Sequence, residues 1–210
     1  MKRGKSMSKF TEYIGSQFGN PRGLVGKCCC LIMNYINKAM YKNVVKYISL
    51  KKQESILDIG YGNGYLIQQI YKKCKSNIYG IDISKDMLKA AMKRNKTAAK
   101  AGKINLSVGD CCKLNFNENT FDAVTSVNTV YFWNNTLQGL TEINRVLKKI
   151  GVFYNVVYSK EFLNKLSYTK KGFKLFNKDE LIELGKEAGF SNVSAHDISN
   201  GKSYIIKYVK

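Results

Sequence analysis

The chain has 210 residues, and 44% of them are hydrophobic. A chain of this length and composition can bury a full core, so the composition excludes a fold that must rely on disulfides or metals. No apolar run of 18 or more residues occurs, and the Lys-rich residues 1–9 are not followed by an uninterrupted apolar segment with a cleavage site. We therefore expect a single soluble, cytoplasmic domain, residues 1–210, with no membrane span.

The net charge of +20 makes nucleic acid, anionic lipid and an acidic substrate candidate partners. The first 53 residues hold eleven Lys or Arg against the single acid Glu12. Elsewhere the lysines recur at helical spacing, which is typical of a solvated helix face; they are Lys85, Lys89, Lys93, Lys96 and Lys100. Lys and Asn are abundant throughout, so we favour a general compositional bias over a nucleic-acid-binding surface. The oligomeric state stays open.

The six cysteines form no Cys-x-x-Cys pair, and His196 is the only histidine. Adjacent residues of a helix point about 100° apart, so Cys28, Cys29 and Cys30 cannot easily share one ion. We therefore predict free, mostly buried thiols in a reducing compartment and no metal site. The alternative, a thiol site for a soft element such as arsenic, requires Cys111 or Cys112 to meet the first group in space.

Strand-like and helix-like segments alternate over residues 54–158, which is typical of βαβ units in a mostly parallel sheet. We predict strands at residues 55–59, 77–81, 104–108, 121–127 and 152–157. Amphipathic helices follow at residues 66–71, from the N-cap Ser84, and at residues 137–147. A last helix at residues 178–188 ends at Gly189. Two closing strands, residues 192–196 and 203–209, have no helix between them and predict an antiparallel edge.

An apolar face extends over residues 26–48 ahead of this sheet. It predicts one long helix that buries its apolar side, and we interpret residues 1–50 as a helical cap on a core of residues 51–210. Residues 18–23 contain the only proline, Pro21. With Tyr13, they are expected to form a lid that contacts substrate; the alternative is an ordinary turn between two cap helices.

A glycine-rich turn follows the first strand: Asp58, Gly60, Gly62 and Gly64 alternate with other residues. Such a turn lets the backbone approach a ligand and presents free helix N–H groups to it. The dinucleotide-binding pattern Gly-x-Gly-x-x-Gly would place its third glycine at Tyr65. The early glycine therefore weakens a nicotinamide or flavin interpretation.

The turn resembles the first motif of class I S-adenosylmethionine (SAM)-dependent methyltransferases, acid-x-Gly-x-Gly-x-Gly. Asp82 lies 22 residues after Gly60, where this family places the acid that binds both ribose hydroxyls. Asp110 and its neighbour resemble the element that meets the adenine. Residues 114–124 and 145–151 resemble the small-molecule, ubiquinone/menaquinone methyltransferase-like branch, although Ile150, Cys111 and Cys112 depart from its usual residues. The resemblance implies SAM as cofactor, bound by Asp58, Gly60, Tyr61, Gly62, Gly64, Asp82, Ile83, Asp110, Cys111 and Asn128.

The resemblance also implies the fold: a doubly wound, seven-stranded Rossmann-like α/β sheet of order 3-2-1-4-5-7-6, with the last strand antiparallel and an N-terminal helical cap. Each motif residue has a simpler interpretation as well. Asp58 and Gly60 can shape a tight turn, and Asp82 and Asp110 can cap a helix and a turn. Their placement at successive ends of parallel strands, where such sheets bind ligands, favours the cofactor interpretation.

The acceptor side is expected just after the fourth strand. Asn128 and Tyr131 repeat the spacing of the Asn-Pro-Pro-Tyr motif of amino-group methyltransferases without its prolines. We hypothesise catalytic roles for Asn128, Tyr131 and Tyr13, although Asn128 can instead contact the methionine part of SAM. The predicted function is methyl transfer to a small molecule by in-line displacement, for which a base is often optional. The alternatives are an RNA or protein methyltransferase and a non-catalytic SAM-binding module. His196 is expected to be structural or exposed.

Overall fold

The computed structural model describes residues 9–49 and 54–210. The Lys-rich residues 1–8 and the expected boundary between residues 50 and 51 lie outside these ranges. Within them, no helix is long and apolar enough to cross a membrane.

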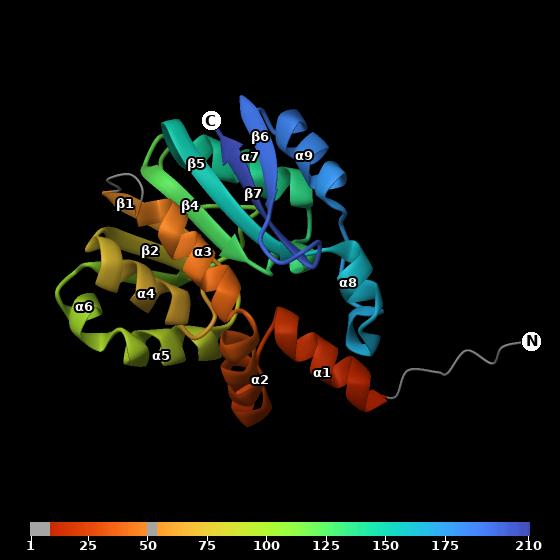
Figure 1. Cartoon of the computed structure of the whole chain (residues 1–210). Helices are drawn as coiled ribbons and strands as arrows, with labels where there is room; N and C mark the ends of the chain where they lie inside the picture. Colours follow the sequence, from red (N-terminus) through yellow and green to blue (C-terminus); the bar gives the residue numbers. More distant parts are fainter. Residues whose placement is uncertain (1–8, 50–53) are drawn as a thin grey trace, which may run out of the picture.

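The described chain forms a seven-stranded sheet in the order β3-β2-β1-β4-β5-β7-β6 (Figure 1). The strands are β1 (Ser55–Ile59), β2 (Asn77–Asp82), β3 (Ile104–Val108), β4 (Phe121–Val127), β5 (Leu147–Tyr158), β6 (Asn192–Asp197) and β7 (Ser203–Val209). The pairs from β3 to β5 are parallel, whereas β7 is antiparallel to both β5 and β6. The predicted order and the antiparallel last strand are confirmed.

Helices cover both faces of the sheet. They are α1 (Lys9–Gly19), α2 (Gly23–Ile36), α3 (Lys38–Ser49), α4 (Tyr65–Cys74), α5 (Lys85–Arg94), α6 (Lys96–Lys100), α7 (Thr136–Val146), α8 (Lys160–Asn164) and α9 (Lys178–Glu187), with short 3₁₀ turns η1 (Val130–Phe132) and η2 (Ser167–Thr169). Helices α3 and α4 pack on one face, and α7 and α9 on the other (Figure 1). Helices α1 and α2 lie beyond the end toward which β4 points, so they form a cap over the carboxyl ends of the parallel strands.

The core lies in the centre of the sheet, because β1 and β4 are covered on both faces. Ile56, Leu57, Val124 and Phe153 are fully buried. Both strands are buried over nearly their whole length, as expected for strands that are covered on both faces. The buried polar side chains Asp58 of β1 and Thr125 of β4 bond to each other.

The N-terminal helix is not continuous, which corrects the expectation for residues 26–48. Asn37 separates α2 from α3, and its backbone angles (φ −85°, ψ 7°) leave the helical region. Its side chain is buried against β4 and β5 rather than solvated. The apolar face is also only half covered. Met40, Val44 and Ile48 of α3 are buried on the sheet, whereas the outward side of α2 is exposed.

Strand β5 begins five residues earlier than predicted, directly after α7. Phe121 pairs with Leu147 and Ala123 with Val152, so the intervening residues of β5 bulge out of the ladder. Within this bulge Ile150 has a φ of 62°, a left-handed conformation that is strained for a β-branched residue. The early start was not predicted, because the bulge interrupts the alternation of inward and outward side chains that marks a regular strand. Elsewhere Ser84 caps α5 as predicted, its Oγ accepting a hydrogen bond from Met87 N at 3.4 Å.

Candidate functional site

The glycine turn after β1 is built from three left-handed residues. Gly60, Gly62 and Gly64 have φ values of 70°, 54° and 73°. A Cβ added to Gly60 would collide with Thr129, and one added to Gly64 would lie 2.8 Å from the Ala91 Cβ atom. A Cβ at Gly62 would meet nothing within 4 Å. Gly60 and Gly64 therefore allow close packing of the protein itself, whereas Gly62 faces open space.

Asp82, at the end of β2, holds the turn in place. Its Oδ2 atom accepts a hydrogen bond from Gly62 N at 2.8 Å, and its Oδ1 atom accepts one from Ser84 N at 2.9 Å. Burial raises the pKa of this carboxyl, and the two backbone hydrogen bonds oppose the rise. Each carboxylate oxygen can accept a second hydrogen bond, so Asp82 can also receive two ligand hydroxyls.

Asp58 is a buried acid inside β1, next to the turn. Its Oδ1 atom accepts a hydrogen bond from Thr125 Oγ1 of β4 at 2.7 Å. Burial raises the pKa of Asp58 to about 7, although the bond from Thr125 opposes this and the nearby Asp82 adds to it. A cation in the same cavity would favour the ionised form of this carboxyl.

The end of β3 supplies the third part of the site. Asp110 accepts hydrogen bonds from Cys112 N at 2.9 Å and from Asn134 Nδ2 at 3.2 Å. Cys111 beside it is buried. Tyr61 from the glycine turn donates a hydrogen bond to the Ser107 carbonyl at 3.0 Å, which links the turn to β3. Acids from β1, β2 and β3 thus lie at one edge of the sheet.

Asn128 follows β4 and is bonded on both sides of its amide. Its Nδ2 atom donates to Asn37 Oδ1 at 3.1 Å. Its Oδ1 atom lies 3.1 Å from the Tyr131 hydroxyl and 3.3 Å from Tyr158 N, both of which can donate to it. The Tyr158 hydroxyl donates to Asn37 Oδ1 at 3.1 Å. Asn128 therefore joins the cap to the sheet, and its Oδ1 atom already has donors within the protein.

A cleft of about 1200 Å³, counting the part open to solvent, connects these groups. Its lining includes nine of the ten predicted cofactor-binding residues: Asp58, Gly60, Tyr61, Gly62, Asp82, Ile83, Asp110, Cys111 and Asn128.

 The tenth, Gly64, does not line the cleft, because it lies behind the turn against α5.

The three proposed catalytic residues lie in different surroundings. Asn128 lines the cleft, whereas Tyr131 and Tyr13 are not among its lining residues. Tyr131 is buried, and its hydroxyl accepts a hydrogen bond from Tyr158 N at 2.6 Å. The 3₁₀ turn η1 directs this side chain into the core, away from the cleft lining. Tyr13 is about half exposed on α1. The spacing of Asn128 and Tyr131 places their side chains within hydrogen-bond distance, 3.1 Å.

The turn between α1 and α2 does reach the cleft, as the lid hypothesis expects. Phe18, Gly19 and Pro21 line it. The Pro21 carbonyl accepts a hydrogen bond from Ser84 Oγ at 2.8 Å, so the turn is fastened to the end of β2. The alternative interpretation is also correct in part, because residues 20–22 connect two cap helices.

The cysteines are free thiols in the described chain. Cys29, Cys30 and Cys111 line the cleft, and the Cys30 thiol lies 3.4 Å from Met87 Sδ. Burial raises the pKa of Cys30 to about 12 and that of Cys111 even further. Among the residues that the structure describes, one group of ligand atoms lies close enough to hold an ion, within 4.8 Å, and it consists of Asp110, Cys111 and Cys112. The first cysteine group does not join it, so the geometry gives no support to a shared thiol site. His196 is exposed, as expected.

Several polar residues in the cleft were not singled out from the sequence. Gln17, Asn34, Asn37, Tyr41, Asn63 and Thr129 all line it. Asn34 Nδ2 donates to Asn63 Oδ1 at 3.2 Å, a second link between the cap and the glycine turn. Asn37 left one signal in the sequence, because it is a polar residue within the apolar pattern of residues 26–48.

Comparison with known proteins agrees with this geometry. Residues 57–155 match the family model described as a methyltransferase domain. The uncharacterized methyltransferase YdaC of Bacillus subtilis is 32% identical over 121 residues, which cover 57% of this chain and 65% of the relative. The ubiquinone/menaquinone biosynthesis C-methyltransferase UbiE of Geotalea daltonii is 27% identical over 194 residues, which cover 79% of this chain and 83% of the relative. The chain thus spans less than two thirds of the Bacillus relative.

A solved SAM-dependent methyltransferase from Aquifex aeolicus shares the fold, with a TM-score of 0.66 and 19% identity over 80% of this chain and 88% of the other. The sheet order, the glycine turn and the matched family model lead to one conclusion. Residues 57–155 match a methyltransferase domain, and the chain shares the Rossmann-like fold of SAM-dependent methyltransferases, whose cofactor is S-adenosylmethionine.

Proposed function

We propose that this protein transfers the methyl group of SAM to a small-molecule acceptor held between the sheet and the cap. The observation that carries the proposal is that Phe18, Pro21 and Asn37 of the cap line the same cleft as the glycine turn. The cap and the glycine turn therefore face one another across a single cleft, so an acceptor that enters it lies beside the proposed cofactor site.

The cleft suits SAM in three respects. Gly62 leaves open space where the backbone can approach a ligand. Asp82 has lone pairs left for ribose hydroxyls, and Asp110 lies one strand further for the adenine. Asp58 and Asn128 lie on the opposite side, toward β4. We therefore propose Asp58, Gly60, Tyr61, Gly62, Asp82, Ile83, Asp110, Cys111 and Asn128 as cofactor-binding residues, with Gly64 shaping the turn.

SAM supplies an activated methyl group on a sulfonium, which an acceptor attacks in line with the departing sulfur. The residues of this chain then have to align the acceptor and exclude water. Phe18 and Phe132 cover the cleft with apolar surface, and Asn37 and Asn128 fix the boundary between the cap and the sheet. Asn128 and Tyr131 act in this scheme as positioning residues, since their hydrogen bonds are made within the protein. Tyr13 has no assigned role.

Two further parts of the proposal concern the surroundings of the protein. The chain is proposed to work as one domain in a reducing cytoplasm, where its free thiols persist. A small-molecule partner is favoured over RNA or protein because the α1–α2 turn covers the cleft and is fastened to Ser84.

The test is a methyl-transfer assay with isotope-labelled SAM and a cell extract, followed by mass spectrometry of the product. We expect the label in a small molecule that resists nuclease and protease. Label in RNA or protein would contradict the small-molecule acceptor. Calorimetry of the purified protein with S-adenosylhomocysteine is the companion measurement, and absence of binding would overturn the cofactor site itself.

A further inference from the structure

The outward side of α2 is an exposed apolar surface. Val25, Leu31, Ile32, Tyr35 and Ile36 form it, and we call these residues the outer face of α2. They are five of the ten large hydrophobic side chains that are exposed in the described chain, and Tyr35 alone is 82% exposed. Single exposed apolar residues are ordinary, but a contiguous group on one helix marks an interaction surface.

Basic residues border this surface at both ends. Arg22 directly precedes α2, Lys38 follows it, and Lys42 lies one turn further along α3; all three are exposed. Residues 13–53 contain no Asp or Glu. An apolar helix face whose own segment carries cations and no acid is complementary to an anionic lipid surface; the neighbouring acid, Asp86 of α5, is engaged by the Gly23 N–H group.

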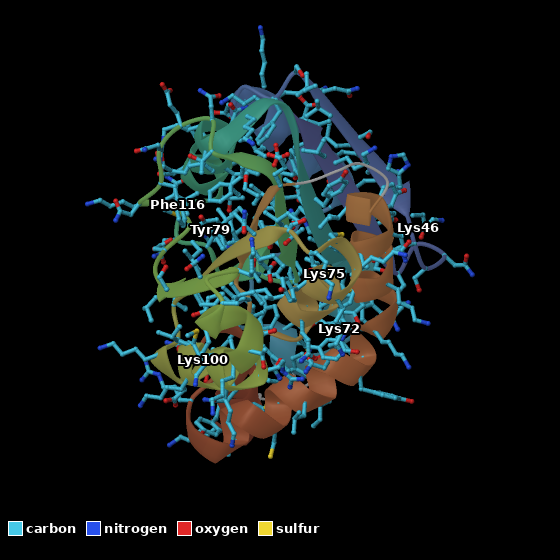
Figure 2. All side chains as sticks on the ribbon, turned by 90° about the vertical axis from the view of Figure 1, so that its left-hand side faces the viewer. Lys46, Lys72, Lys75, Tyr79, Lys100 and Phe116 are labelled. Atoms are coloured by element: carbon cyan, nitrogen blue, oxygen red, sulfur yellow. The ribbon has the colours of Figure 1, made fainter. Side chains whose placement is uncertain are left out.

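Neighbouring elements extend the positive charge. The Gly23 N–H group donates to Asp86 Oδ2 at 3.0 Å, which joins the start of α2 to α5. Exposed lysines of α5 lie close to this junction in the chain, at Lys85 and Lys89. Lys72 on α4, Lys75 directly after that helix and Lys100 on α6 are also exposed and lie on the face of the molecule shown in Figure 2.

We propose that the outer face of α2 docks on an anionic membrane surface. Its apolar side chains enter the boundary between headgroups and acyl chains, and Arg22, Lys38 and Lys42 contact the acidic headgroups. A second copy of the chain is a poorer occupant, because a symmetric interface would bring these cations together with no acid between them. Nucleic acid offers phosphates to the lysines but no apolar partner to the face itself.

The position of α2 agrees with this docking. With α1 it lies at one end of the molecule, beyond the carboxyl ends of the strands, and the C-terminus is at the other end (Figure 1). The opposite side of the same helix, with Cys29, Cys30 and Met33, lines the cleft. Docking therefore places the cleft about one helix diameter, ~10 Å, from the lipid.

The experiment is flotation of the full chain with vesicles of phosphatidylcholine, with and without phosphatidylglycerol. We expect binding only to vesicles that contain phosphatidylglycerol, weakened by salt. The variant with Leu31→Ser and Ile32→Ser should bind about tenfold more weakly or worse. The matched control is Ile150→Ser, which replaces an exposed isoleucine at the far end of β5 and should leave binding unchanged.

The charges have a matched control as well. Lys38→Glu with Lys42→Glu should weaken binding by roughly fivefold or more for each lysine, whereas Lys149→Glu, at another exposed site, should have a much smaller effect. Equal losses in the α2 variants and the controls would overturn the proposal. So would absence of vesicle binding by the wild type, or a dimer in analytical ultracentrifugation that Leu31→Ser and Ile32→Ser dissociate. Circular dichroism verifies that every variant is folded.

Discussion

Asn128 at the end of β4 donates a hydrogen bond to Asn37 at the break between α2 and α3, over 3.1 Å. The two residues are 91 positions apart in the chain, and this contact joins the cap to the sheet beside the cleft. Asn37 Oδ1 also accepts a hydrogen bond from the Tyr158 hydroxyl. The Asn37 side-chain oxygen thus accepts hydrogen bonds from Asn128, directly after β4, and from Tyr158 of β5.

Asn37→Ala should therefore loosen the cap. It leaves the Tyr158 hydroxyl without its Asn37 acceptor and the Asn128 amide with only the weak acceptor Met40 Sδ, and a buried unpaired group costs about 1–3 kcal/mol. We expect a loss of that size in the free energy of unfolding in urea, together with weaker binding of S-adenosylhomocysteine in calorimetry. Asn43→Ala on α3 is the control, because the Asn43 amide bonds only to the Ala39 carbonyl. Equal losses in both variants would contradict the linking role of Asn37.

Gly62→Ala separates cofactor contact from backbone strain. Gly62 and Gly102 both have left-handed φ values, 54° and 69°, and an added Cβ meets nothing within 4 Å at either position. Alanine should cost each variant about 1–2 kcal/mol of stability. Only Gly62→Ala should also weaken SAM binding, since only Gly62 lines the cleft. Equal affinities of the two variants for SAM would show that the turn does not approach the cofactor.

Asp58 should make stability depend on pH. Its pKa is raised by burial from 3.8 to about 7, so the folded state retains a proton that the unfolded state loses. Its contribution is therefore fully present below about pH 4 and is lost as the pH rises through about 7. As the pH rises from about 4 to about 7, the wild type should therefore lose unfolding free energy relative to Asp58→Asn. Urea titrations at several pH values measure it.

Asp122→Asn is the control for that titration. Burial opposes ionisation of Asp122, but hydrogen bonds from Lys148, Ser55 and Glu54 outweigh it and lower the pKa. Its contribution is present above the unfolded pKa and disappears only as the pH falls through the lower folded value. From about pH 5 to 7 the difference between wild type and Asp122→Asn should stay flat. A flat difference for Asp58→Asn as well would mean that Asp58 is ionised throughout.

Ile150→Gly should stabilise the protein. Ile150 has a left-handed φ of 62° and is 75% exposed, so glycine removes strain and sacrifices little packing. The gain is about 1 kcal/mol, because the larger chain entropy of unfolded glycine offsets part of the relief. The midpoint of urea unfolding should rise with an unchanged slope. A lower midpoint would indicate that the Ile150 side chain has a stabilising contact.

The strands and the positions of the glycine turn and the acids at their ends could be predicted because local sequence determines both. Apolar runs end at Gly60, Asp82 and Asp110, and parallel strands bring their carboxyl ends to one edge. The cap was harder to predict. Its apolar periodicity does not reveal which side is covered, and Asn37 breaks the helix through partners far away in the chain. Tyr131 shows the same limit, since its spacing from Asn128 fits an acceptor site and a buried hydrogen bond equally well.

Adjacent residues of helix α2 lie on two different surfaces of the protein. Cys29 and Cys30 face the cleft, whereas Leu31 and Ile32 face outward. Substitutions of Cys29 or Cys30 change the lining of the cleft and leave the outer face of α2 as it is. Substitutions of Leu31 or Ile32 change the outer face and leave the cleft lining as it is. With the two roles proposed above, independent mutations in a single helix would change the acceptor and the membrane docking separately.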